Sequence, residues 1–209
     1  MEFNIESLRL VMRYCSALME KNKQYLIDLD SALGDGDLGL TMAAGFAEGL
    51  SFVTSCTEED LGKCTMQMGM AISKKVPSTM GTLVASGFMA AGKAVKGKSS
   101  LNTQEFVLFI DGFVNGVMSR GKANPGDRTI VDSIYPGAVA VKKAVESGED
   151  ISSAIKAGFE AAKKGVEDTK QMKAKFGRAV YYADQVLGKE DQGAVVGKLI
   201  FEGFFKALV

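Results

Sequence analysis

The chain has 209 residues, which suits a single domain over residues 1–209 with a sizeable core. Lys+Arg and Asp+Glu number 25 each, and this balance argues against a general nucleic-acid binder, which needs a basic excess. The chain has no histidine, so Ser-His-Asp and Cys-His catalysis, histidine metal sites and a histidine general base are all excluded.

The expected location is cytoplasmic. No apolar run reaches the roughly 18 residues that a membrane helix needs. The first residues, Met1 to Ser7, carry two acids and no base, unlike a signal peptide. The three cysteines (Cys15, Cys56 and Cys64) form no Cys-x-x-Cys pair, so zinc ligation is not expected.

Apolar residues recur at steps of three and four nearly throughout, which predicts an all-α fold. The expected helices cover residues 4–23, 38–54, 58–73, 80–96, 103–119, 134–147, 151–168 and 192–207. Thr57 with Asp60 and Asn102 with Glu105 resemble capping boxes, and Asp150 suits an N-cap. No run alternates with period two, so we expect no strand.

The main loops between these helices are 28–37, 75–80, 120–133 and 170–191. The last two exceed a tight helix–helix turn, and long irregular loops in a compact bundle are often functional. The first holds Asp30, Asp35 and Asp37 among glycines. It also contains a formal dinucleotide-binding pattern, Gly-x-Gly-x-x-Gly, but two of these carboxylates would repel a pyrophosphate and no strand precedes it.

The three carboxylates have two interpretations that the pattern alone leaves open. Like charges this close cost free energy unless cations neutralise them, and oxygen-only ligands favour magnesium, manganese or calcium. The glycines let the loop fold tightly, and the helix start at Leu38 to Thr41 offers unpaired N–H groups to a phosphate. The alternative is a solvated acidic turn with an N-cap aspartate.

Two basic segments lie in the later loops. One is Arg120 to Thr129, and the other includes Lys173, Lys175, Gly177 and Arg178. Taken singly, each also fits an ordinary basic helix end or exposed loop. Together with an acidic loop, they supply the charges that a nucleotide polyphosphate needs.

Taken in order, the segments resemble the L subunit of dihydroxyacetone kinase, a DhaL-like nucleotide-binding domain. The motif Asp-x3-Gly-Asp-x-Asp-His-Gly of that family corresponds to Asp30–Gly39. Arg-Gly-Lys-Ala-x-Pro-Gly-Asp-Lys-Thr corresponds to Arg120–Thr129 and differs at Arg128. Gly-Arg-Ala-x-Tyr is matched by Gly177–Tyr181, and Asp-Pro-Gly-Ala by Asp191–Ala194.

The resemblance implies a barrel of about eight antiparallel helices, with ADP or ATP and two magnesium ions at one end. It implies metal ligands at Asp30, Asp35 and Asp37, and a role for Arg178 in stabilising the transferring phosphoryl group. The implied nucleotide contacts are Leu38, Gly39, Leu40, Thr41, Thr79, Met80, Gly121, Thr129, Ile130, Arg178, Asp191 and Gly193.

The resemblance also implies partners. In the family a separate K subunit or domain binds the ketose. The phosphate comes either from ATP or from a phosphohistidine protein of the sugar phosphotransferase system, which recharges a permanently bound ADP. No nucleic-acid or membrane partner is expected, and a homodimer is left open.

The sequence departs from the family pattern at several points around the nucleotide end. Leu38 replaces a histidine, Pro77–Gly81 replaces a Gly-Gly-x-Ser-Gly stretch, and Gln192 replaces a proline. These departures suggest a divergent member, so the ketose stays unassigned and another short ketose is an alternative. A second alternative is a non-catalytic, ADP-dependent sensor that docks on a regulator. A magnesium-dependent phosphatase is disfavoured, because the sequence shows no evident base to activate water.

Overall fold

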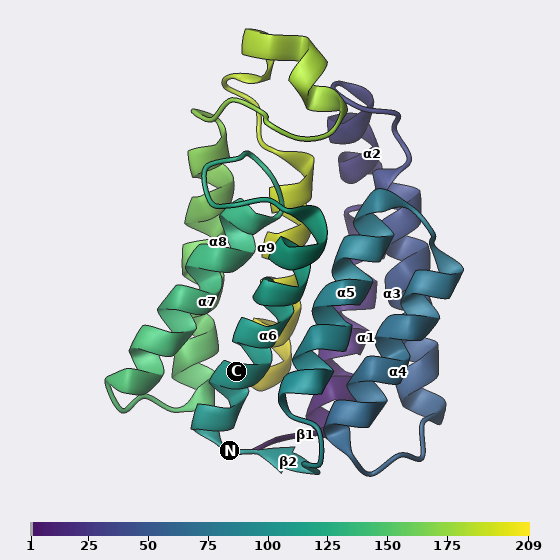
Figure 1. The fold of residues 1–209 in the computed structure, drawn as a ribbon, viewed down its shortest axis with the longest axis vertical. Helices are drawn as coiled ribbons and strands as arrows, with labels where there is room; N and C mark the ends of the chain where they lie inside the picture. The colour runs from purple at the N-terminus through teal and green to yellow at the C-terminus, as the bar shows by residue number, and fades with distance from the viewer. Residues whose placement is uncertain (1) are drawn as a thin grey trace.

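The computed structural model describes residues 2–209 and, apart from Ala183, their side chains. Helices make up most of this part of the chain (Figure 1). Their bounds are α1 Ile5–Lys21, α2 Lys23–Ser31, α3 Leu38–Ser55, α4 Leu61–Lys75, α5 Thr79–Ala94, α6 Thr103–Gly121, α7 Val131–Glu146, α8 Ile151–Thr169 and α9 Gln192–Leu208. A 3₁₀ helix, η1, covers Arg178–Val186.

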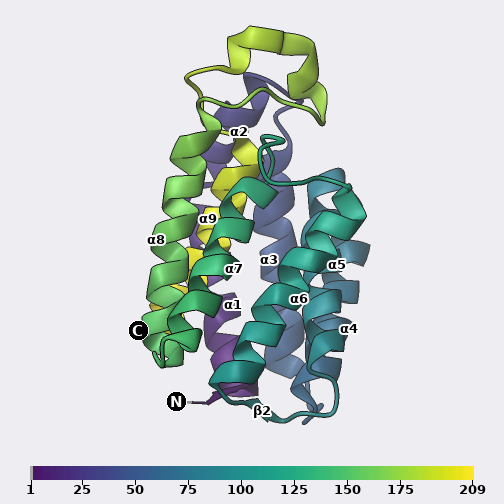
Figure 2. The same ribbon diagram turned by 60° about the vertical axis from the view of Figure 1, so that its left-hand side comes forward.

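Eight of these helices form a closed ring, which confirms the predicted antiparallel barrel. Each of α3 to α9 packs on its predecessor along the chain, and α9 packs on α1, which in turn packs on α3. Figure 2, turned from the view of Figure 1, shows the same helices running upright beside one another. The remaining helix, α2, contacts α3 and α9 at one end of the ring.

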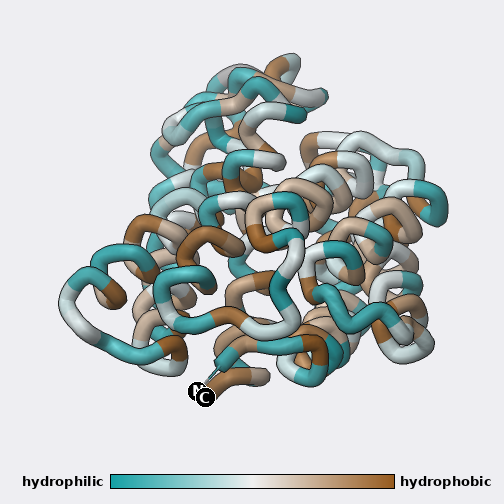
Figure 3. Tube along the Cα trace, turned by 60° about the horizontal axis from the view of Figure 1, so that its bottom comes forward, coloured by the Kyte–Doolittle hydropathy of each residue, from teal (hydrophilic) through white to brown (hydrophobic). Residues whose placement is uncertain are grey.

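The up-and-down course separates the connections into two groups (Figure 1). The segment after α2, the α5 start, the α6–α7 connection and η1 all lie at one end. Both chain termini and the α3–α4, α5–α6 and α7–α8 connections lie at the other end, and the N and C labels overlap in the view of Figure 3. The functional loops predicted from sequence therefore converge on one end of the barrel.

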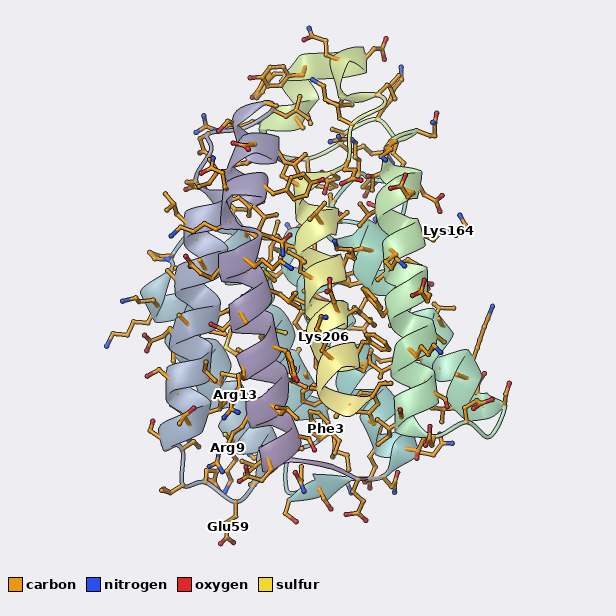
Figure 4. The ribbon with its side chains drawn as sticks, turned by 180° about the vertical axis from the view of Figure 1, so that it is seen from behind. Phe3, Arg9, Arg13, Glu59, Lys164 and Lys206 are labelled. Carbon is orange, nitrogen blue, oxygen red and sulfur yellow. The ribbon has the colours of Figure 1, made fainter. Side chains whose placement is uncertain are left out.

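The barrel interior is apolar and rich in phenylalanine. Near the termini, Phe3 packs against Phe106, Phe109 and Phe204, with ring centroids 5.2 to 6.1 Å apart. Figure 4 shows Phe3 at this end, whereas Lys164 projects outward from α8. Each fully buried side chain of this kind contributes about 1.5–3 kcal/mol through the hydrophobic effect. This phenylalanine cluster therefore stabilises the end of the barrel opposite the loops.

Three local predictions were wrong in detail. The predicted loop 28–37 begins inside α2, because Asn22 interrupts one long helix and a new helix starts at Lys23. Part of the 170–191 loop forms η1. A two-residue pair, β1 Phe3–Asn4 with β2 Ser100–Leu101, exists where no strand was expected, since two residues are too few to show alternation.

The caps were predicted more accurately. Asn102 and Glu105 form the reciprocal capping box, with bonds of 3.0 and 2.9 Å. Asp150 accepts from the Ser153 N–H at 2.8 Å. The box at Thr57 was wrong: Asp60 itself is the N-cap of α4 and accepts from the Lys63 N–H. Within residues 2–209, no helix has the length and apolar character required to span a membrane.

Candidate functional site

Three carboxylates meet at the loop end of the barrel. Asp30 lies in the last turn of α2, and Asp35 and Asp37 lie in the turn that leads to α3. One ligand oxygen from each lies within 4.8 Å of the other two. Asp30 is buried, while Asp35 and Asp37 are exposed, so the cluster opens to solvent on one side.

The electrostatics of the cluster favour a cation. Partial desolvation raises the pKa of Asp37, and the charges of Asp35 and Asp30 raise it further, while Arg178 lowers it. Arg178 donates to Asp35 at 2.9 Å. Within the described part of the chain, no ion pair involves Asp30 or Asp37. A divalent cation would relieve the repulsion that Arg178 leaves.

The donor set fits magnesium on structural grounds. It consists of carboxylate oxygens, the hard ligands that magnesium prefers. Gly34 forms a cradle beside Asp30, because a Cβ there would collide with the Oδ1 atom of that carboxylate. Gly36 has a φ of +77°, which a residue with a side chain adopts only with strain. The glycines of the turn thus let the carboxylates converge.

Two adjoining cavities extend from the cluster. The first, of about 250 Å³, contains the three carboxylates together with Leu38, Met80, Arg178 and Gln192. The second, of about 500 Å³, mixes apolar and polar walls, among them Leu83, Val117, Arg120, Thr129, Ile130 and Phe176. Ser78, Thr79 and Gly177 line both. The two cavities therefore adjoin at these three residues, and together they are called the groove below, with an acidic end and a larger, less charged end.

The start of α3 differs from the simple phosphate-binding helix end. The Leu38 N–H donates to Asp30 Oδ2 at 3.3 Å, so it positions a carboxylate. Gly39 is buried, and a Cβ there would collide with the Lys23 carbonyl oxygen, so this glycine allows α2 to approach α3. Leu40 is 53% exposed, and the lining of the acidic cavity includes Leu38 but neither Leu40 nor Thr41.

Arg128 supports the groove from behind. Its side chain is only 1% exposed. It donates to the carbonyl oxygens of Lys189 and Glu190 at 3.1 and 3.3 Å and pairs with Asp191 at 3.4 Å. Asp191 is the N-cap of α9 and accepts from the Ala194 N–H at 2.7 Å. This ion pair fixes the α6–α7 connection to the start of α9.

The α6–α7 connection has further internal bonds. The buried Asp132 accepts from the backbone N–H groups of Gly126 and Thr129 at 2.5 and 2.7 Å. Asp127 accepts from the Asn124 N–H at 2.8 Å and pairs with Lys175 of the 170–191 segment. These bonds order the segment that places Thr129 and Ile130 in the larger cavity.

The 170–191 segment covers the acidic turn. A small apolar cluster of Leu33, Ala179 and Val186, separate from the main core, joins the two segments. Gly177 adopts a φ of +69° and directs the chain into η1, where Arg178 is the first residue. Arg178 thereby reaches the carboxylates from the opposite wall of the groove.

The predicted residues are distributed unevenly. Those that line the groove are Asp30, Asp35, Asp37, Leu38, Thr79, Met80, Gly121, Thr129, Ile130 and Arg178. Asp191 and Gly193 lie behind it: Asp191 pairs with Arg128, and a Cβ on Gly193 would approach Met80 and the Ile130 N–H within about 3 Å.

Several lining residues were not singled out as contacts from sequence. Ser78, Phe176 and Gln192 belong to them. Ser78 is the N-cap of α5 and accepts from the Gly81 N–H at 3.0 Å, which was visible as a serine three residues before a helical glycine. Phe176 carried no local signal. Gln192 was visible only as the residue that replaces a proline in the Asp191–Ala194 motif, and the tertiary fold is what brings its side chain to the groove.

Comparisons with known proteins agree with this architecture. The family model of the DAK2 domain matches residues 32–206. The ADP-binding subunit DhaL of the PEP-dependent dihydroxyacetone kinase from Escherichia coli is 32% identical, over 86% of each chain. The corresponding subunit of PEP-dependent dihydroxyacetone kinase 2 from Listeria innocua is 32% identical, over 95% of this chain and 94% of the relative.

A solved structure shows the same fold. The dihydroxyacetone kinase from C. freundii, in complex with AMP-PNP and Mg²⁺, superposes with a TM-score of 0.73 at 23% sequence identity. The match covers 94% of this chain and 33% of that kinase, so this chain spans about a third of it. The extent of the family match and the identity to full-length relatives place this chain in the DAK2 domain family.

Proposed function

We propose that this chain is the nucleotide-binding subunit of a ketose kinase of the dihydroxyacetone type. The observation that carries the proposal is the groove with two chemically distinct ends that share Ser78, Thr79 and Gly177. A nucleotide has the same division, with a largely apolar base at one end and charged phosphates at the other. The larger cavity would receive the nucleoside, and the acidic cavity the metal-bound phosphates.

Asp30, Asp35 and Asp37 would hold magnesium, and we propose two ions by the family resemblance. Bound magnesium neutralises the charge that phosphoryl transfer concentrates on the phosphate oxygens. Leu38, Thr79 and Met80 line the acidic cavity, and Gly121, Thr129 and Ile130 line the larger one, which supports them as nucleotide contacts. Gly39, Leu40, Thr41, Asp191 and Gly193 stay predictions.

Arg178 is the catalytic residue of this proposal. Its guanidinium pairs with Asp35 across the groove, and both side chains are accessible to solvent. A guanidinium forms charge-assisted, paired hydrogen bonds with phosphate oxygens as readily as with a carboxylate. Arg178 can therefore exchange Asp35 for the transferring phosphoryl group when the nucleotide is bound.

The proposed acceptor is a ketose held on a separate K subunit, which must also accept the proton of the ketose hydroxyl. The proposed donor is a phosphohistidine protein of the phosphotransferase system. Its P–N bond breaks as a P–O bond forms to the terminal oxygen of ADP, and the new γ-phosphoryl group then passes to the ketose. The E. coli and L. innocua relatives, described as ADP-binding subunits, support this donor over free ATP.

The first test is to purify the chain without added nucleotide, denature it and identify the released small molecules by mass spectrometry. One equivalent of ADP, absent after treatment with EDTA, is the expected result. An empty protein that binds Mg-ATP on titration would indicate exchangeable ATP as the donor. Failure to bind either nucleotide would contradict the proposal.

A second experiment separates the kinase from a non-catalytic sensor. The chain is mixed with a dihydroxyacetone-binding K subunit and either ATP or a phosphoenolpyruvate-charged phosphohistidine protein, and ketose phosphate is followed. Formation of ketose phosphate supports the kinase. Tight ADP binding without any ketose phosphate, for dihydroxyacetone and other short ketoses alike, would favour the sensor.

A further inference from the structure

Gln192 occupies an unusual position beside the carboxylate cluster. It is the first residue of α9, directly after the N-cap Asp191. Its Nε2 atom donates to Asp30 Oδ1 at 3.4 Å, across 162 residues of sequence. It also lines the acidic cavity together with all three aspartates. The family pattern has proline here, so the resemblance assigns this side chain no role.

The Gln192 amide completes the positioning of Asp30. The Leu38 N–H donates to Asp30 Oδ2 at 3.3 Å, so the two oxygens of one carboxylate accept from opposite ends of the chain. Two donors on different oxygens fix the plane of a carboxylate better than one. The amide orientation follows from this contact, because an amide oxygen facing a carboxylate oxygen would be repelled.

This orientation leaves the amide oxygen without a protein partner. Gln192 Oε1 is buried, and no hydrogen bond to it exists among the residues that the structure describes. A buried acceptor left without a hydrogen bond costs about 1–3 kcal/mol. An amide oxygen is also a hard ligand of the kind that binds magnesium or its coordinated water. The cost is offset if a hydrated cation in the cavity donates to this oxygen.

We propose that Gln192 is a positioning residue of the metal site: its Nε2 holds Asp30, and its Oε1 accepts from the water shell of the cation. The inference rests on the proposed magnesium–nucleotide function. The inference adds to that function a side chain, Gln192, which reaches the metal site from the first turn of α9. Loss of this side chain should weaken metal binding while the fold stays intact.

The chain permits a well-controlled test, because proline is tolerated at the first position of a helix, where the N–H has no intrahelical partner. Gln192→Pro therefore removes the amide and keeps the helix start, and Gln192→Leu removes it with a side chain of similar size. Gln171→Leu, at an exposed glutamine of the 170–191 segment, is the matched control. Circular dichroism and thermal unfolding verify the fold of each variant.

The measurement is the Mn²⁺ dissociation constant in the presence of saturating ADP, by electron paramagnetic resonance of free Mn²⁺. Both Gln192 variants should bind Mn²⁺ at least about tenfold more weakly, as is typical when a partner of a metal ligand is lost. Gln171→Leu should match the wild type.

The outcomes distinguish this inference from the proposed function. Mn²⁺ binding by the wild type with both Gln192 variants within twofold of it would overturn the inference alone. Weaker binding by the leucine variant but not by the proline variant would also overturn it, because added apolar bulk would then be the cause. A wild type that binds no Mn²⁺ with ADP would overturn the proposed function as well.

Discussion

Single carboxylates at the loop end have opposite effects on binding and on stability. Asp35→Ala should weaken Mg-ADP binding by roughly 100-fold or more, since it removes a direct ligand. Without metal, the variant should unfold at the same temperature as the wild type or at a higher one. The substitution relieves repulsion within the cluster, and the exposed ion pair with Arg178 that it removes contributes only about 0–1 kcal/mol. Titration calorimetry and thermal unfolding measure the two effects.

The matched control for this substitution is Asp28→Ala, which removes an exposed carboxylate of α2 outside the cluster. It should leave Mg-ADP affinity unchanged. Full affinity in Asp35→Ala would contradict the assignment of Asp35 as a metal ligand. Equal losses in both variants would point to a general effect of net charge.

The buried Asp191 makes stability depend on pH. Burial raises the pKa of Asp191 to about 6, although the Ala194 N–H and Arg128 act in the opposite direction. The folded protein therefore keeps the proton of the Asp191 carboxyl at pH values where the unfolded chain has lost it. The stability from this group is therefore complete below about pH 4 and is lost as the pH rises through about 6.

Asp191→Asn tests this dependence, because asparagine is also a good N-cap and cannot titrate. Between pH 4.5 and 7, the wild type should lose about 2 kcal/mol of unfolding free energy relative to the variant, because most of the shift of about two pKa units is expressed in this range. Urea unfolding at both pH values gives the difference. A constant offset between variants, which an unpaired Arg128 would produce at any pH, is subtracted; parallel pH profiles would contradict the prediction.

At the scale of elements, the α2–α3 contact determines where Asp30 lies. Gly39 has no room for a Cβ beside the Lys23 carbonyl oxygen. Gly39→Ala should therefore separate the two helices, lower the unfolding free energy by about 1–3 kcal/mol and weaken Mg-ADP binding. Ser51→Ala, on an exposed position of the same helix, should change neither. Unchanged stability in Gly39→Ala would show that α2 adapts without cost.

The elements themselves were predictable to different degrees. Long amphipathic helices such as α6 and α8 were visible because their apolar periodicity extends over many turns, and their caps at Asn102 and Asp150 were marked by side-chain chemistry. The short α2 was missed because only Leu26 and Asp30 of it are buried, too few for a periodic signal. The carboxylate cluster was visible as a local pattern.

The contribution of Gln192 could not be read from sequence, since it depends on a contact with Asp30 across the whole chain. The role of Arg128 was hidden for the same reason. In the sequence it is one cation in a basic loop, and its contacts with Lys189, Glu190 and Asp191 exist only after the 170–191 segment folds over. Local motifs thus located the groove, whereas the contacts of Arg128 and Gln192 that support it could be identified only from the tertiary structure.

For the whole molecule, the 170–191 segment should report on nucleotide binding. Phe176 lines the larger cavity, whereas Tyr181 is 89% exposed. Mg-ADP should therefore slow chymotryptic cleavage after Phe176 several-fold and protect Tyr181 less. Mass spectrometry of timed digests, with and without EDTA, measures both rates in one sample, so Tyr181 acts as an internal control. Equal rates at Phe176 in all conditions would contradict occupation of this cavity.

The closed ring also has a consequence for how the chain folds. Its closure joins the first and last helices, α1 with α9, and Phe3 with Phe204. These contacts have nearly the largest sequence separation in the chain, so their loop-closure entropy must be overcome late in folding, and they raise the contact order. During synthesis the barrel cannot close until α9 has left the ribosome. Because both ends of the chain lie at the same end of the barrel (Figure 1), a linker could join them. A circular permutant opened at the α7–α8 turn would make the α1–α9 contact local, but ring closure would then depend on the more extensive α7–α8 contact between its new ends, so it should fold no faster than the wild type.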